Sequence, residues 1–106
     1  MVKYLQTVRR FIIFEYPVLS VHIPIGLRSY VNGHEEVTVS GETVGELIAA
    51  VGHEYPRILS HLLSGNGALE KGWRLFLGGQ DVATLQGMET PVDLEVVLSI
   101  VPGKLQ

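Results

Sequence analysis

The chain contains no cysteine. This absence excludes a thiol nucleophile, a disulfide framework and a cysteine-ligated metal. It fits a reducing compartment, where disulfides are rare, and we expect a cytoplasmic protein. The chain also has no excess of basic residues. It has 8 Lys and Arg and 11 Asp and Glu, which gives a net charge of −3. We therefore expect no nucleic-acid partner.

Long apolar runs are missing as well. No run approaches the roughly 18 residues of a membrane-spanning helix, so no membrane partner is expected. The run Phe11–Phe14 is followed by Glu15 and is shorter than the apolar region of about 7–15 residues in a signal peptide. We treat residues 1–17 as an N-terminal extension to a domain over residues 18–106. The extension is an extra strand or loosely held chain, or else a strand that pairs with a sheet edge in this domain or a partner's.

The first part of the domain has the pattern of two strands. Hydrophobic residues make up 46% of the chain, enough for one packed core. The segment Val18–Pro24 alternates apolar and polar residues, with Ser20 and His22 on the polar face. A second alternating segment covers residues 34–40, after a loop over residues 26–33. Together they predict an antiparallel pair.

A helix follows the second strand. Thr43 and Glu46 have the spacing of a capping box, in which each side chain accepts a backbone N–H at the start of a helix. Gly52 is placed to end this helix. A short second helical segment begins at Tyr55-Pro56. The apolar stripe of the main helix consists of Val44, Leu47, Ile48 and Val51.

The remaining segments are strands and turns. Trp73–Leu77 alternates as a strand, and Gly78-Gly79 predicts a tight turn. Asp81–Leu85 is expected to be a short return strand, and residues 87–91 are expected to be irregular. The apolar run Leu94–Val101 predicts the last strand.

The order of these elements restricts the topology. Two hairpins that flank one crossover helix can form a single sheet only if the first and last strands pair in parallel. We therefore predict an α+β fold of the ubiquitin-like β-grasp class. It has a mixed sheet of four to five strands, one main helix packed on one face, and a short helix.

Six short motifs occur in order between Val21 and Pro102. They are Ile23-Pro24 with Leu27-Arg28, Thr43–Leu47, Tyr55-Pro56, Phe76–Val82, Leu85–Pro91 and Ile100–Pro102. Together they resemble the small sulfur-carrier family of the MoaD/ThiS type, and most of all its stand-alone carriers that supply cysteine or related thio-biosyntheses.

The resemblance implies a protein that is not itself an enzyme and that needs no cofactor or metal. It implies docking on an adenylating, ubiquitin-activating-like enzyme or on a sulfur-transfer enzyme, or on another protein through an open sheet face. In the family, a flexible tail ends in Gly-Gly, and its carboxylate is adenylated and then converted to a thiocarboxylate.

The expected conjugation end of this chain comprises Pro102, Gly103 and Gln106, and it departs from that pattern. Only Gly103 is a glycine, whereas Lys104-Leu105-Gln106 carry side chains that a glycine-matched adenylation channel does not accept. We therefore expect that the chain as it stands is not adenylated.

One face of the sheet is a candidate for partner binding. Strand alternation places a partly apolar and partly charged set of side chains opposite the main helix, a composition typical of protein contacts. An ordinary open face, or one covered by residues 1–17, is the alternative. The four histidines have no ligand spacing, so no metal site is predicted. The partner-binding set is His22, Arg74, Phe76, Ser99 and Val101.

Three functions remain open from the sequence. The first is a sulfur carrier that is activated after removal of residues 104–106. The second is a β-grasp interaction module without conjugation chemistry, and the third is a regulatory subunit of an enzyme complex with an obligate partner.

Overall fold

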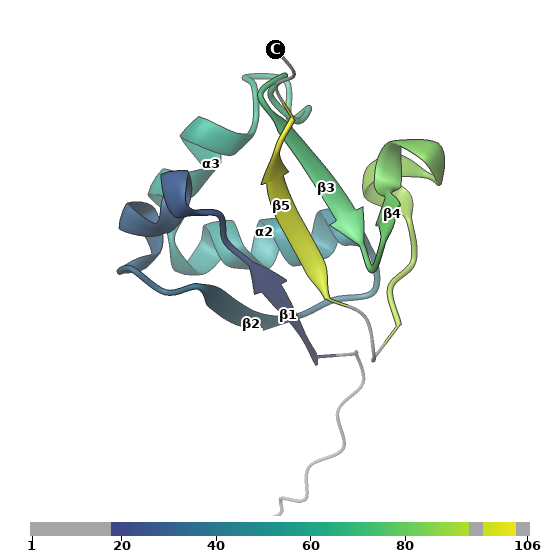
Figure 1. The fold of residues 1–106 in the computed structure, drawn as a ribbon, viewed down its shortest axis with the longest axis horizontal. Coiled ribbons are helices and arrows are strands. Elements are labelled where there is room, and N and C mark those ends of the chain that lie inside the picture. The colour runs from purple at the N-terminus through teal and green to yellow at the C-terminus, as the bar shows by residue number, and fades with distance from the viewer. Residues whose placement is uncertain (1–17, 94–96, 104–106) are drawn as a thin grey trace, which may run out of the picture.

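The computed structural model describes residues 18–93 and 97–103. The expected N-terminal extension, the start of the last strand and the final three residues of the tail lie outside this part of the chain. The described residues form one sheet with helices packed on one side of it (Figure 1). The elements in chain order, with η for a 3-10 helix, are β1 (Val18–His22), η1 (Ile25–Val31), β2 (Glu36–Ser40), α2 (Val44–Glu54), α3 (Pro56–Leu62), β3 (Trp73–Leu77), β4 (Gln80–Asp81), η2 (Val82–Thr84), η3 (Gly87–Glu89) and β5 (Leu98–Pro102).

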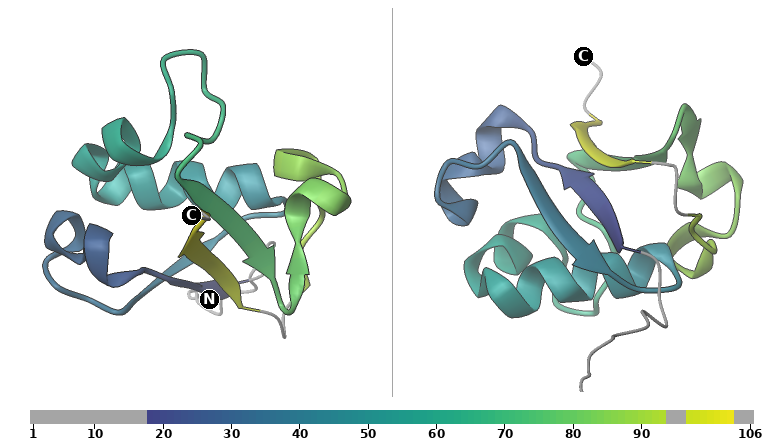
Figure 2. Two further views of the ribbon diagram at one scale, coloured as in Figure 1. Left: turned by 45° about the horizontal axis from the view of Figure 1, so that its top comes forward. Right: turned by 90° about the horizontal axis from the view of Figure 1, so that it is seen from below.

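The sheet has five strands in the order β2-β1-β5-β3-β4. The central pair, β1 and β5, is parallel, with Val21 opposite Leu98. The other neighbouring pairs are antiparallel. Helix α2 crosses one face of the sheet and leaves the other face open among the described residues (Figures 1 and 2). The predicted α+β, β-grasp architecture is confirmed.

The hydrophobic core lies between α2 and the sheet. Both central strands direct alternate side chains toward the helix, and these side chains are fully buried. Removing this apolar surface from water is the main force that holds the helix on the sheet, at about 25 cal/mol per Å². The most deeply buried members are Val21, Ile23, Val31, Val44, Leu47, Val51, Ile58, Leu62, Leu98 and Ile100.

The start of α2 has the predicted capping interactions. The Thr43 hydroxyl accepts the backbone N–H of Glu46 at 3.2 Å. The Glu46 carboxylate in turn accepts the backbone N–H of Glu42 at 2.7 Å. Two N–H groups at the helix start therefore have partners, which stabilises this end of the helix by about 0.5–2 kcal/mol.

The prediction that Gly52 ends the helix is wrong. Helix α2 continues to Glu54, and Gly52 is buried within it. A Cβ at this position would lie 2.4 Å from Cγ of Leu59 on α3. Gly52 therefore lets α2 and α3 approach each other closely.

Two loop segments contain helical turns that were not predicted. The expected loop over residues 26–33 contains η1, whose Leu27 and Val31 are buried and hold it against the core. It ends at Asn32, which has a left-handed φ of 59°. The expected irregular segment over residues 87–91 contains η3.

The prediction of a return strand over Asp81–Leu85 is also wrong, except at Asp81. Strand β4 contains only Gln80 and Asp81. The Asp81 carboxylate then accepts the backbone N–H of Ala83 at 2.9 Å, and the chain turns into η2. The glycine turn before β4 is as predicted, with Gly78 at a φ of 63°.

Replacing Leu47 with Ala tests the packing of α2. Leu47 is fully buried under the sheet, so Leu47→Ala should lower the free energy of unfolding by about 2–5 kcal/mol. The matched truncation Ile25→Ala removes a side chain that is 79% exposed and should change it by less than about 0.5 kcal/mol. Urea denaturation measures both, and equal stabilities would contradict this packing.

The role of Gly52 can be tested by a double-mutant cycle. Gly52→Ala forces its new Cβ against Leu59 and should lower the free energy of unfolding by about 1–3 kcal/mol. In a Leu59→Ala background the same change should be neutral or stabilising, because Ala is the better helix former by about 1 kcal/mol. A Gly52→Ala effect that is independent of residue 59 would show that the helix contact does not require glycine.

Candidate functional site: the outer sheet face and the end of β5

One row of side chains runs across all five strands on the face opposite α2, which we call the outer face. Strand register places His22 beside Glu36 on one side and beside Ser99 on the other. Ser99 lies beside Phe76, and Phe76 lies beside Asp81. His22, Ser99 and Phe76 are half-buried, so their side chains are available in part to a binding partner.

A second set of side chains flanks this row on β3 and β5. Arg74 lies beside Val101 in the register. Val97 directly precedes β5, two residues before Ser99, and is 42% exposed. The outer face therefore has an aromatic ring at its centre, two valines beside it, and charged groups toward the β4 edge.

Arg74 and Asp81 form the one ion pair among the described residues. Their closest nitrogen and oxygen atoms are 3.4 Å apart, with side-chain exposures of 48% and 19%. An exposed pair of this kind contributes at most about 1 kcal/mol to stability. Its main effect here is to hold Arg74 at the rim of the face, next to Phe76.

The end of β5 is tied to the sheet as far as Gly103. Pro102 lies opposite Trp73, and the backbone N–H of Gly103 donates to the Gly72 carbonyl at 2.7 Å. A Cβ at Gly103 would lie 2.7 Å from Cγ of Arg74. Gly103 thus packs against the sheet.

The five residues predicted for partner binding all lie on the outer face. Of the predicted tail residues, Pro102 and Gly103 lie at the end of β5, whereas Gln106 is outside the described residues. Sequence reasoning missed Asp81 and Val97 on this face. Val97 could have been found from its alternation with Ser99 and Val101.

The described histidines form no metal site. Residues 18–93 and 97–103 contain no group of three or more metal-ligating side chains. His61 instead stacks on Tyr30, with ring centroids 4.2 Å apart, and its carbonyl accepts the Trp73 indole N–H at 3.0 Å. Over the same part of the chain, every helix is too short or too polar to cross a lipid bilayer.

Neither a family model nor a curated protein matches the chain, but solved structures do. A chain of the Amycolatopsis orientalis BexX/CysO complex matches with a TM-score of 0.76 and 27% identity, over 83% of this chain and 98% of that one. Mycobacterium tuberculosis CysO matches with a TM-score of 0.75 and 26% identity, over 81% of this chain and 99% of that one.

The small archaeal modifier protein SAMP1 of Methanosarcina acetivorans has a TM-score of 0.75 at 20% identity, over 84% of this chain and 95% of that one. This third likeness supports the fold alone. The neighbours are ubiquitin-like sulfur-carrier proteins of the MoaD/ThiS type. The chain resembles these carriers. The resemblance predicted from its motifs is thereby confirmed, and the neighbours are small carrier or modifier proteins, not enzymes.

Adjacent residues on β3 allow a matched test of which side chains face outward. Leu75 is 1% exposed on the helix side, whereas Phe76 is half-buried on the outer face. Leu75→Ala should lower the free energy of unfolding by about 2–5 kcal/mol. Phe76→Ala should lower it by no more than about 1–2 kcal/mol and leave the fold intact. Thermal and urea unfolding measure both, and the reverse order of effects would mean that the strand is turned over.

Proposed function

We propose that this chain is a sulfur-carrier-like protein that docks on an adenylating or sulfur-transfer enzyme through its outer sheet face. Residues 18–106 act as the carrier-like domain, and residues 1–17 are an extension to it. The catalytic groups belong to the partner, and this chain supplies recognition. The row of outer-face side chains around Phe76 carries the proposal.

The composition of the outer face supports docking on a protein. Phe76 lies between Ser99 and Asp81, with no strand or helix of the described chain packed over it. Aromatic residues that are ringed by smaller contacts often dominate the binding energy of an interface. Arg74 and Asp81 at the rim supply the charges that orient a partner.

The connection between the face and the tail also supports this function. Strand β5 contributes Ser99 and Val101 to the outer face, and its last residue is Pro102. An enzyme that binds the face therefore lies close to the point where the tail leaves the sheet. Extended chain covers about 3.3–3.6 Å per residue, so residues 104–106 reach about 10 Å beyond Gly103.

The sequence at the tail argues against carrier chemistry in the chain as it stands. Adenylation requires a terminal carboxylate oxygen to attack the α-phosphorus of ATP, with pyrophosphate as the leaving group. Lys104, Leu105 and Gln106 add bulk on the way to that phosphorus, and Gly103 is held by its hydrogen bond to Gly72. These features favour the second candidate, a β-grasp interaction or regulatory subunit that keeps the docking face without conjugation.

ATP–pyrophosphate exchange with an adenylating enzyme of this family separates the two functions. The chain ending at Gln106 should give no exchange above background. A variant ending at Gly103 should also be inactive or weak, because its carboxylate stays at the edge of the sheet. The same-length variant Leu105→Gly/Gln106→Gly should give exchange, because it restores a Gly-Gly end without changing the docking face.

Two controls connect exchange to the outer face. Adding Phe76→Ala to the Gly-Gly variant should reduce exchange at limiting protein concentration at least about tenfold, as expected for loss of about 1.4 kcal/mol or more of binding energy. Adding Thr38→Ala, an exposed outer-face change on β2, should not. Exchange by the unmodified chain would refute the inactive-tail proposal. If the Gly-Gly variant gives no exchange, docking on such an enzyme is refuted. The interaction-subunit function would then be the one that stands.

A further inference from the structure

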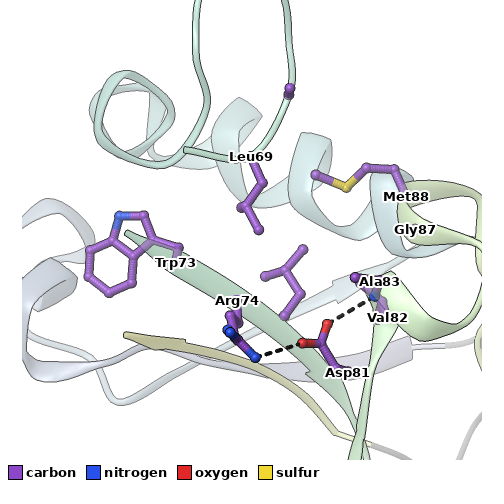
Figure 3. A pocket seen from close by; sticks show the side chains of 10 residues that line it. Leu69, Trp73, Arg74, Asp81, Val82, Ala83, Gly87 and Met88 are labelled. Carbon is purple, nitrogen blue, oxygen red and sulfur yellow. Dashed lines mark hydrogen bonds and ion pairs between the residues drawn. The ribbon is translucent and has the colours of Figure 1, made fainter. Parts of the chain in front are cut away.

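The two edges of the sheet differ in how they are protected. The edges are β2 and β4, at opposite ends of the strand order (Figure 1). Strand β4 has only two residues, and the chain then forms η2, where Val82 and Ala83 line an apolar pocket of about 520 Å³ beside β3 (Figure 3). Leu75 at this edge is 1% exposed. A very short edge strand with covering chain beside it is a common protection against pairing with other molecules.

Strand β2 lacks this protection. It has five residues that pair in regular register with β1. Its sequence, Glu-Val-Thr-Val-Ser, contains neither Pro nor Lys, the residues that commonly block an edge, and its one charged residue is Glu36 at the first position. Glu36, Thr38 and Ser40 are exposed, and no described strand lies beside them. The edge of β2 is therefore open within the described part of the chain.

The free backbone groups of this edge belong to the same three residues. In an antiparallel pair, residues that bond to the neighbouring strand alternate with residues whose N–H and C=O groups point away from it. Ile23 donates its N–H to the Glu35 carbonyl at 2.8 Å, in the register that β1 and β2 share. Odd-numbered residues of β2 therefore bond to β1, and Glu36, Thr38 and Ser40 direct their backbone groups outward. No other described residue bonds to the backbone of these three.

We propose that β2 of a second copy of this chain pairs antiparallel with this edge, around a two-fold axis at Thr38. The pairing joins two five-stranded sheets into one continuous sheet. Two-fold symmetry is the commonest symmetry of homo-oligomers, and it requires a surface that is complementary to itself. The edge of β2 meets that requirement.

The register centred on Thr38 pairs all five residues of β2. It places Glu36 opposite Ser40 of the second copy, and Val37 opposite Val39. The outward residues of the two strands then face each other, so that each outward N–H meets a C=O. Thr–Thr pairs across strands are favourable, whereas like charges directly opposite each other are not. The two Glu36 residues lie at opposite ends of the pairing, about 13 Å apart along the strands.

Residues 1–17 are the other candidate occupant of this edge, because Val18 lies opposite Ser40 in the register. A strand formed by them would have to connect to β1 across the end of β2, where the chain also leaves toward α2. Connections that cross at one edge of a sheet are avoided in proteins. A second copy requires no such crossing, and this favours it as the occupant.

The dimer leaves the outer face free. The two-fold axis of an antiparallel pair is perpendicular to the sheet, so the helices of both copies lie on one side and both outer faces lie on the other. The edge of β2 is also separated from β5 by β1. The pairing therefore does not depend on the docking function proposed for the outer face.

Opposite charges at residue 38 test the pairing, because a two-fold axis at Thr38 places this residue opposite itself. Sedimentation of the full-length chain should show a dimer that dissociates on dilution. Thr38→Asp and Thr38→Lys should each raise its dissociation constant about threefold or more, because like charges then lie directly opposite each other. An equimolar mixture of the two variants should restore the dimer. The matched controls Ser20→Asp and Ser20→Lys place the same charges on β1, beside Thr38 on the same face, and should leave the dimer unchanged.

Amide hydrogen exchange identifies the occupant. The Thr38 N–H should exchange at least about tenfold more slowly in concentrated than in dilute protein, whereas the Val37 N–H, which bonds to β1, should be protected in both. The Ile100 amide in the central strand reports that each variant is folded. A chain that stays monomeric up to about 1 mM, or a dimer that charges at residue 38 leave unchanged, would overturn the proposal. Thr38 protection that is independent of concentration would also overturn it, because the occupant would then be residues 1–17.

Discussion

The parallel pairing of β1 with β5 in the middle of the sheet is the constraint on which the rest of the structure depends. It joins the first and last strands of the domain, which can occur only if the chain between them crosses one face of the sheet. Helix α2 makes that crossing and buries Leu47 and Val51 against both strands. No other described element covers the opposite face, which is the outer face.

The same pairing connects recognition to the tail. It aligns His22 with Ser99, so that the outer-face row continues across the centre of the sheet. The end of β5 pairs instead with β3, where Pro102 lies opposite Trp73, and the hydrogen bond from Gly103 to Gly72 extends this pairing by one more residue. In the proposed function, docking depends on the outer face of the sheet, whereas conjugation would depend on the few residues after Gly103. A chain can lose the second property through changes at residues 104–106 and keep the first.

The sequence was sufficient to predict the fold because the decisive signals were local. Strand alternation in Val18–Pro24 and Trp73–Leu77, and the cap at Thr43, each agree with the tertiary structure. Alternation also assigned the predicted binding residues to one face, because a strand has a period of two. Strand register, which makes His22, Ser99 and Phe76 neighbours, follows from long-range pairing that one sequence does not reveal.

The errors have tertiary causes. Gly52 has the sequence context of a helix end, and only the position of Leu59 shows that the glycine allows two helices to pack closely. In the segment after β4, the apolar residues Val82 and Leu85 suggested a strand. The Asp81 carboxylate instead bonds to the backbone ahead and starts a 3-10 turn.

The central proposal is that this sulfur-carrier-like chain docks on an adenylating or sulfur-transfer enzyme while its own C-terminal end carries no sulfur. Intact mass spectrometry of the protein purified from its native host, in complex with whatever partner it retains, tests this claim most directly. The account predicts a chain that still contains Lys104, Leu105 and Gln106 and has the mass of an ordinary carboxylate. A chain that carries the mass gain of a sulfur-for-oxygen exchange, whether it ends at Gln106 or has been trimmed, would contradict the account.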